Sequence, residues 1–325
     1  MIQFVQKINI HFDFNLIWRT VMNKPKVCGV VVTYNRKELL LRNVKSLLAQ
    51  SYPLDILIYD NASTDGTYAF LKENGILEFD NVFYVNGDKN IGGAGGFCEG
   101  EKIAYEKGYD YIWLMDDDGY CINEDTLMNL MQACSKERCI YNSYVICDIE
   151  EKKPTFDIGG AKSFSEVLNC SEHGILHGVG NPYNGTLVPR ECFTDIGFTD
   201  YRFFIYGDEY DFVARSKKAG YNWETIVDSL YYHPVNRNVT KEFSVLGHKF
   251  DVKEQPVWKL YLEIRNSTYN SIVHNGNTFI PYFVFKAVLI SINSKDKKSK
   301  RLKYSLLGVH DAIHANFDRE IMFWV

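Results

Sequence analysis

Hydrophobic and polar positions form long, regular blocks between residues 26 and 134. Continuous apolar runs rich in β-branched residues predict strands that are buried on both faces, since a strand with one solvent face would alternate with a period of two. We expect such strands at 27–33, 54–60, 82–86 and 111–115. Between them, apolar residues recur at helical spacing, which predicts helices at 36–50, 67–74, 94–107 and 124–134. Strands that alternate with helices indicate a parallel sheet with right-handed crossovers.

The pattern becomes less regular after about residue 140. Strand-like segments and glycine-rich turns follow, and one clear helix is predicted at 209–218. The C-terminal part of the chain is helical in pattern and increasingly basic. There is no internal repeat and no low-complexity linker, so we expect one large α/β domain with a helical C-terminal extension.

Composition narrows the class of protein. The chain of 325 residues is 46% hydrophobic, and its net charge of −5 argues against a general nucleic-acid binder. Eight scattered cysteines without a Cys-x-x-Cys pair favour reduced thiols in the cytoplasm over a disulfide framework or a zinc site. The first residues lack the apolar core of a signal peptide, and the apolar stretch 279–292 is too short to span a bilayer. We expect a soluble or membrane-associated protein.

Three consecutive carboxylates, Asp116, Asp117 and Asp118, follow the strand predicted at 111–115. They cannot lie inside a buried strand, because an unpaired buried carboxylate costs several kcal/mol or is neutralised by a pKa shift. They must therefore lie at the exposed end of the strand, where open α/β sheets bind their ligands. Clustered hard oxygens there suit Mg²⁺ or Mn²⁺, which in turn binds a diphosphate. Taken alone, the triplet could equally form a solvated acidic turn.

Polar clusters also lie at the ends of two other predicted strands. These clusters are Thr33-Tyr-Asn-Arg36 and Asp60-Asn-Ala-Ser63. Each alone is a weak signal, since Asn and Asp are common in turns, but together they predict a nucleotide pocket at one edge of a sheet. The segment Asn90-Ile-Gly-Gly-Ala-Gly-Gly-Phe97 has glycines that let the backbone approach a ligand, or that form a flexible turn before a helix. It does not match the dinucleotide fingerprint, because Cys98 stands at the third glycine position.

In this order and spacing, these segments resemble family 2 glycosyltransferases with the GT-A fold. Downstream, Asn184-Gly-Thr-Leu187, Phe204–Phe212 and Tyr232-His-Pro234 continue the resemblance, which covers about residues 26–270. The glycine-rich element and the Asp triplet are similar to the galactofuranosyltransferase-like branch, and rhamnosyltransferases are close relatives. The resemblance implies a Rossmann-like, mostly parallel sheet flanked by helices. It divides the chain into an N-terminal extension (1–25), a GT-A catalytic domain (26–270) and a helical, basic C-terminal extension (271–325).

The resemblance also implies roles for individual residues. Asp60 would hydrogen-bond the uracil, and the nucleotide-binding residues as a set would be Thr33, Asn35, Arg36, Asp60, Asn61, Asn90, Gly92, Gly93, Asp116 and Asp117. Asp116 and Asp118 lie two apart, so on an extended segment they point to the same side. With His233, which stands where the family often supplies a histidine, they would bind the divalent cation, Mn²⁺ or Mg²⁺. A lone histidine after two tyrosines is otherwise more often structural than a ligand.

A separate base must take the proton from the attacking sugar hydroxyl. In the family this base belongs to a Gly-Glu-Asp or Asp-Asp pair, whereas here the pair is Asp208-Glu209 in the opposite order. Alignment on Gly207 and Asp211-Phe212 puts Glu209 at the base position, with Asp208 as the other candidate. Acidic residues at a helix N-terminus also complement the helix dipole, whether or not they act in catalysis. The segment Tyr261–Asn266 resembles an element of related transferases and could equally be a contact between helices.

We therefore expect an inverting, metal-dependent glycosyltransferase that moves a sugar from a UDP-sugar, with UDP-galactofuranose as a candidate, to a glycan or lipid-linked glycan acceptor in cell-surface polysaccharide synthesis. Within the class, the alternative is a rhamnosyltransferase that uses dTDP-rhamnose. In other classes, the alternatives are a nucleotidyltransferase that releases pyrophosphate and a non-catalytic nucleotide-sugar binder.

The chain also carries a basic cluster beside the apolar segment 279–292, formed by Lys295, Lys297, Lys298, Lys300, Arg301 and Lys303. Such a cluster suits anionic lipid headgroups, at roughly 1 kcal/mol per charge near the surface, or else forms an ordinary solvated loop. We expect a cytoplasmic enzyme, peripheral on the inner face of the cell membrane, with no nucleic-acid partner.

Overall fold

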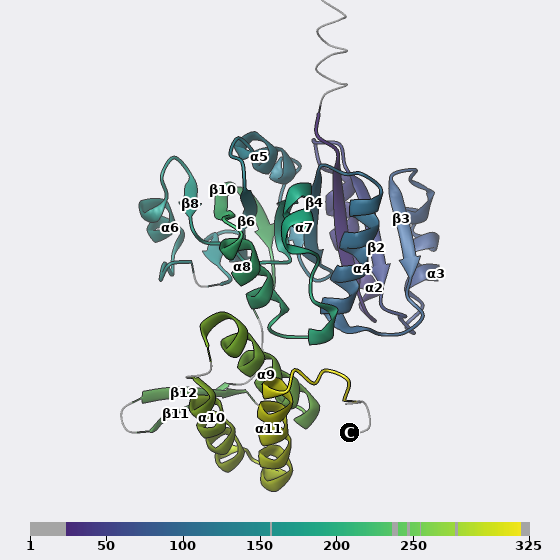
Figure 1. Cartoon of the computed structure of the whole chain (residues 1–325). Coiled ribbons are helices and arrows are strands. Elements are labelled where there is room, and N and C mark those ends of the chain that lie inside the picture. The colour runs from purple at the N-terminus through teal and green to yellow at the C-terminus, as the bar shows by residue number, and fades with distance from the viewer. Residues whose placement is uncertain are drawn as a thin grey trace, which may run out of the picture.

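The computed structural model describes residues 24–156, 158–235, 240–245, 248–253, 255–276 and 279–319, with side chains outside 240–253. The N-terminal extension predicted at 1–25 lies almost wholly outside the described residues. Within them, a mixed sheet forms the centre of the molecule, and helices cover both of its faces (Figure 1).

The strand order along the sheet is β3-β2-β1-β4-β9-β6-β10-β5. The strands are β1 (Val27–Thr33), β2 (Asp55–Asp60), β3 (Val82–Asn86), β4 (Tyr111–Asp116), β5 (Tyr120–Cys121), β6 (Cys139–Asp148), β9 (Asn184–Pro189) and β10 (Asn222–Tyr232), with β7 (Lys153–Pro154) and β8 (Ile175–His177) paired at the side. The first four strands in the sequence pair in parallel, as the alternation with helices predicts. β9 enters antiparallel between β4 and β6, and the short strands β5, β7 and β8 also pair antiparallel.

Two hydrophobic cores lie on opposite faces of this sheet. One face is covered by α2 (Lys37–Leu48), α3 (Thr67–Glu73) and α5 (Thr126–Ala133), which contribute Leu40, Leu71 and Leu127 to the first core. The other is covered by α4 (Gly92–Glu106), α7 (Arg190–Ile196) and α8 (Asp208–Lys218), which contribute Phe97, Phe193 and Phe212. A smaller core includes α6 (Phe164–Cys170). The buried strands are apolar throughout because neither of their faces meets water.

Glycines bring α4 unusually close to the sheet. A Cβ at Gly96 would lie 2.4 Å from the Val32 side chain, and one at Gly100 would lie 2.5 Å from that of Val30. The helix therefore starts inside the glycine-rich segment, two residues before the predicted start at 94, because its glycines serve packing as well as turning. This packing holds the N-terminus of α4 at the carboxyl edge of the sheet.

The C-terminal part forms a separate helical layer beneath that edge (Figure 1). It consists of the hairpin β11 (Thr240–Val245) and β12 (His248–Lys253), followed by α9 (Val257–Asn270), a π-helical turn at Ser271–Asn275, α10 (Ile280–Asn293) and α11 (Lys298–Ile313). The three α-helices share a small core of Leu260, Ile264, Phe283, Ile290 and Val309. Thus α9, which the predicted boundary at 270 assigns to the catalytic domain, packs with the C-terminal helices. The boundary itself stays a prediction.

Candidate functional site

A cavity of about 600 Å³ lies at the carboxyl edge of the sheet. This volume suits a nucleotide-sized ligand. The lining residues are Val32, Thr33, Tyr34, Arg36, Asn61, Asn90, Gly92, Gly93, Asp116, Asp117, Phe204, Ile205, Trp258 and Lys259. Eight of the ten residues predicted to bind the nucleotide are in this set, and the other two, Asn35 and Asp60, are not.

Asn35 and Asp60 instead hold the strand ends together. The side-chain oxygen of Asn35 accepts a hydrogen bond from Thr64 N at 2.7 Å, and its backbone N donates to Ser63 Oγ at 2.8 Å. Asp60 is only 1% exposed; its Oδ1 accepts from Ser63 N at 2.8 Å, and its Oδ2 accepts from the Tyr84 hydroxyl. A base that reached Asp60 would have to displace the Tyr84 hydroxyl. Sequence reasoning gave no role to Tyr84, since a tyrosine on a strand carries no motif.

Asp117 is the carboxylate that supports the pocket wall from within. It is buried, and it accepts hydrogen bonds from Thr33 Oγ1 at 2.8 Å and from Arg36 Nη1 at 3.1 Å. Burial raises the pKa of Asp117 to about 6, although the charge of Arg36 partly opposes that shift. Arg36 Nη1 also lies 2.9 Å from Asp118 Oδ2, so one guanidinium joins two members of the triplet while lining the cavity.

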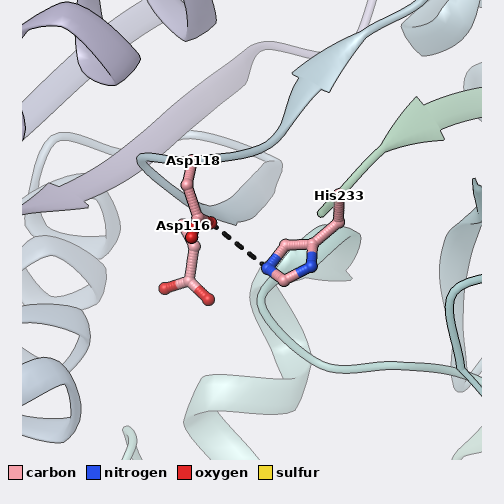
Figure 2. A group of neighbouring side chains, drawn as sticks. All are labelled: Asp116, Asp118 and His233. Atoms are coloured by element: carbon pink, nitrogen blue, oxygen red, sulfur yellow. Dashed lines mark ion pairs between the residues drawn. The ribbon is translucent and has the colours of Figure 1, made fainter. Parts of the chain in front are cut away.

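Asp116, Asp118 and His233 come together beside the cavity, although His233 lies more than a hundred residues further along the chain (Figure 2). Each residue offers one ligand atom, and these atoms all lie within 4.8 Å of one another. His233 Nε2 is 3.2 Å from Asp118 Oδ1, and His233 Nδ1 lies 2.9 Å from the Pro234 carbonyl oxygen. Because a carbonyl only accepts, Nδ1 carries the proton there, and in neutral histidine Nε2 keeps the lone pair that a metal needs.

The electrostatics of this cluster favour an added positive charge. Burial, followed by the charges of Asp118 and Asp117, raises the pKa of Asp116 to about 8. Burial alone would lower the pKa of His233, but its hydrogen bond and charge interaction with Asp118 outweigh burial and raise it. Two carboxylate oxygens and one imidazole nitrogen are a donor set that suits Mn²⁺ or Mg²⁺. The residues therefore fit a divalent cation.

Asp208 and Glu209 begin α8 and differ in their exposure. Asp208 is buried, and burial together with the charge of Glu209 raises its pKa well above the usual range for a carboxyl group. Glu209 is exposed, and its Oε2 accepts a hydrogen bond from Gly207 N at 3.1 Å. Of the two, Glu209 has the carboxylate that an incoming substrate can reach.

The loop before α8 has a strained backbone. Phe204 and Tyr206 both have a φ of 67°, a region that side chains other than glycine rarely adopt. Such residues cost of order 1–3 kcal/mol each and persist only where their surroundings hold them. The Phe204 carbonyl accepts from Ala94 N at 3.1 Å, and a Cβ at Gly92 would lie 2.1 Å from that oxygen. Gly92 therefore has to be glycine, which links the start of α4 to the loop.

Three side chains of α9 hold this loop from the other side. Asn266 Nδ2 donates to the carbonyls of Phe203, Ile205 and Tyr206 at 3.0, 2.9 and 2.8 Å. Arg265 Nη2 donates to Phe203 O at 3.2 Å and to Arg202 O at 3.1 Å, and Asn270 Nδ2 donates to Gly207 O at 2.7 Å. The segment Tyr261–Asn266 is thus more than a contact between helices, because it fixes the loop that precedes Glu209.

Trp258 and Lys259, from the first turn of α9, complete the cavity wall. Sequence reasoning missed both residues. No motif marks them, and their place depends on how the C-terminal helical layer packs beneath the sheet. Lys259 gives the cavity a second cationic side chain in addition to Arg36.

The chain has the GT-A fold. Over 93% of its length the chain matches 82% of the mannosyltransferase PcManGT from Pyrobaculum calidifontis in complex with GDP-Man and Mn²⁺, with a TM-score of 0.53 and 17% identity. Over 91% of its length it matches 58% of GalNAc-T7 with UDP, GalNAc and Mn²⁺, with a TM-score of 0.57 and 13% identity. At such low identity these matches show the fold alone.

Sequence comparison relates the chain to one family of glycosyltransferases. Residues 28–177 match the family described as glycosyl transferase family 2. The chain is 29% identical over 215 residues to galactofuranosyltransferase GlfT1 of Mycobacterium tuberculosis (strain CDC 1551 / Oshkosh), covering 64% of this chain and 70% of that protein. It is 27% identical over 231 residues to GlfT1 of Mycolicibacterium smegmatis (strain ATCC 700084 / mc(2)155), covering 68% and 74%. The protein is a glycosyltransferase with similarity to family 2 and to galactofuranosyltransferases, as the resemblance in its motifs predicts.

Proposed function

We propose that this enzyme transfers a sugar from a UDP-sugar, with UDP-galactofuranose as the favoured donor, to a glycan or lipid-linked glycan acceptor during cell-surface polysaccharide synthesis. The observation that carries the proposal is the position of Asp116, which belongs both to the wall of a nucleotide-sized cavity and to the Asp-Asp-His cluster. The likeness to galactofuranosyltransferases supports the choice of sugar. Eight free thiols suit a reducing compartment, so we assign the reaction to the cytoplasmic face of the cell membrane.

Asp116, Asp118 and His233 would hold the divalent cation, Mn²⁺ or Mg²⁺. When bound, it would act as a Lewis acid and neutralise the charge that develops on the departing diphosphate. Arg36 and Lys259 line the same cavity and can contact the phosphate oxygens directly. Thr33, Asn61 and Asn90 offer polar groups for the nucleoside, and Gly93, where a Cβ would meet nothing within 4 Å, leaves its backbone open to a ligand.

Glu209 is the proposed base. Its carboxylate takes the proton of the acceptor hydroxyl while that oxygen bonds to the anomeric carbon, and the bond between this carbon and the diphosphate oxygen breaks. One displacement from the opposite face inverts the anomeric configuration. The raised pKa of Asp208 favours its protonated form, in which it does not compete for the substrate proton and can instead orient the start of α8.

A panel of nucleotide-sugars tests the donor. With Mn²⁺ present, we expect UDP-galactofuranose to raise the melting temperature most and to be slowly hydrolysed to UDP. A ligand at a hundred times its Kd adds about 2.7 kcal/mol to the free energy of unfolding, which such a measurement detects. A response to dTDP-rhamnose alone would assign the enzyme to the rhamnosyltransferases. Release of pyrophosphate from UTP and a sugar 1-phosphate, without hydrolysis of any nucleotide-sugar, would identify a nucleotidyltransferase. Binding without any turnover in the presence of acceptors would identify a non-catalytic binder.

A further inference from the structure

The outward side of α10 is an apolar surface. Phe283, Ala287 and Ile290 point into the small core that α10 shares with its neighbours. The other side of the helix carries the stripe Tyr282, Phe285, Val288, Leu289 and Ile292, whose spacing places these side chains on one helical face. Tyr282, Phe285 and Ile292 are 47%, 44% and 59% exposed. We call this stripe the α10 face.

A surface helix of a soluble domain normally turns charged and polar residues to the solvent. Here the one charged residue of α10, Lys286, is turned aside to Glu263, with 3.3 Å between Nζ and Oε1. Ser291 is buried and donates to the Ala287 carbonyl at 2.7 Å. The α10 face therefore has no charge of its own, and a contiguous exposed apolar surface of this kind marks an interaction site.

Five lysines lie immediately beyond the α10 face, at 295, 297, 298, 300 and 303. Lys297, Lys298 and Lys303 are exposed. The only acidic residue among residues 294–304, Asp296, is bound to Arg301, with 2.8 Å between Oδ1 and Nη2. Arg301 is itself buried and also donates to Gln255 O at 2.8 Å, so it belongs to the core of the helical layer and not to the basic surface predicted from the sequence.

These lysines occupy the N-terminal end of α11, where positive charge opposes the helix dipole. They lower the stability of their own helix, so an external anion would relieve an unfavourable arrangement. Positive charge is also concentrated here in a chain whose net charge is −5. An apolar stripe bordered by lysines is the pattern of a helix that lies in the interface of an anionic bilayer.

We propose that the α10 face and the adjoining lysines dock this enzyme on anionic phospholipid membranes, with α10 lying in the plane of the interface. No helix among the described residues is long and apolar enough to cross a membrane, so attachment through this surface would be peripheral. A second copy of the chain is a poorer occupant, because a symmetric pairing of α10 faces would bring two groups of lysines close together.

Docking through α10 would also present the active site to the membrane. α10 and α9 share a core, and α9 supplies Trp258 and Lys259 to the cavity wall. The same helical layer thus joins the lipid-facing surface to the site, which suits an acceptor that is anchored in the bilayer. This last step rests on the proposed function, whereas docking itself does not.

Sedimentation with lipid vesicles tests the proposal. We expect the full-length protein to bind vesicles of 30% phosphatidylglycerol in phosphatidylcholine, to bind pure phosphatidylcholine far more weakly, and to lose affinity at high salt. The triple variant Lys297→Glu, Lys298→Glu, Lys303→Glu should bind about tenfold or more weakly. The matched variant Lys45→Glu, Lys72→Glu, Lys218→Glu changes the net charge equally at exposed lysines elsewhere and should bind as the unchanged protein does.

The apolar contribution is tested with Ile292→Asp. Its side chain is exposed, so the melting temperature should hold, while vesicle binding should fall. Equal binding by all variants would overturn the proposal. It would also be overturned if the unchanged protein were a dimer that Ile292→Asp makes monomeric, with no binding to vesicles, since a second copy would then cover the face. Transfer to a short soluble acceptor should be the same in every variant, so failure of docking and failure of the proposed reaction are distinguishable.

Discussion

The aspartates of this protein differ in pKa because the fold places them in different surroundings. Asp118 keeps a low pKa because, although burial would raise it, His233 and Arg36 stabilise the charged form. For Asp208, burial and the charge of Glu209 raise the pKa, which favours the protonated form. The sequence predicted that these carboxylates share a site, but not which of them would be ionised, because that depends on burial and on partners distant in the chain.

The acidic pair gives the sharpest prediction at the scale of the residue. Glu209→Gln should lower kcat by about 10²-fold or more, the usual effect of a positioned base, while donor affinity holds. Asp208→Asn should retain more activity, since the raised pKa of Asp208 already favours a neutral side chain. Single-turnover kinetics and calorimetry with UDP separate the two variants. Normal turnover by Glu209→Gln together with an inactive Asp208→Asn would reassign the base.

Glu101 is a fully buried carboxyl group that no step of the proposed reaction uses. It accepts hydrogen bonds from Thr199 N and Thr199 Oγ1, each at 2.7 Å, and burial nevertheless raises its pKa to about 7. Between its ordinary value of 4.5 and about 7 the folded state binds more protons than the unfolded state, so this group makes stability fall as the pH rises.

In Glu101→Gln this contribution to the slope of the free energy of unfolding against pH should disappear. The contribution is at most about 1.4 kcal/mol per pH unit. Urea unfolding from pH 5 to pH 8 measures it. Glu99→Gln, on the same helix but half-exposed beside Lys102, should leave the slope as it is. An unchanged slope in Glu101→Gln would mean that Glu101 does not titrate in this range.

At the scale of the element, α9 connects the C-terminal helical layer to the reacting end of the site. It holds the strained loop at 203–207 through Asn266 and Asn270, and it adds two residues to the cavity wall. The sequence predicted the first half of the sheet almost residue by residue, β1 at 27–33 included, because its buried strands and amphipathic helices have clear local periods. It did not predict the contacts of α9, since they depend on packing between segments 60 residues or more apart in the chain.

The loop contact can be tested with Asn266→Ala. Three backbone carbonyls each lose one hydrogen bond, so we expect the loop to relax and kcat to fall by about 10- to 100-fold, as a small misplacement of a catalytic group can cause. The KM for the donor should change less, because only two of the fourteen residues that line the cavity, Phe204 and Ile205, belong to this loop. Ser267→Ala, one residue further along the same helix, is the control. A rise in the donor KM with kcat unchanged would show that Asn266 serves the cavity instead of the loop.

At the scale of the whole molecule, the C-terminal layer is held by a buried carboxylate. Asp311 is fully buried and accepts hydrogen bonds from Tyr261 Oη at 2.7 Å and from Arg319 Nη2 at 2.8 Å. Burial alone would raise its pKa, but the hydrogen bonds from Arg319, Tyr261 and His310 outweigh burial and lower the pKa to about 2. The sequence predicted helices in this region, but it could not identify this contact, because nothing local marks one aspartate as buried.

Asp311→Asn should therefore lower the free energy of unfolding at pH 7 by about 1–3 kcal/mol, the scale of hydrogen bonds to a charged group. Because a lowered pKa contributes stability above the ordinary value of 3.8 that is lost as the pH falls toward 2, the difference between the two proteins should shrink at pH 3. Thermal unfolding at both pH values measures this. Asp296→Asn, whose side chain is mostly exposed, should cost much less.

The contact between Asn266 and the loop also affects the order in which parts of the protein can fold. Asn266 follows Phe203 by 63 residues, and chains emerge from the ribosome with the N-terminal part first. The sheet and the nucleotide cavity wall from β1 and β4 can form before α9 exists, whereas the loop before Glu209 lacks its three donors until α9 has been made. The capacity to react should thus appear after the capacity to hold a nucleotide. In nascent chains stalled before residue 257, hydrogen exchange should find amides at 203–207 less protected than those of β1 and β4. A half-made enzyme would then not act on its donor.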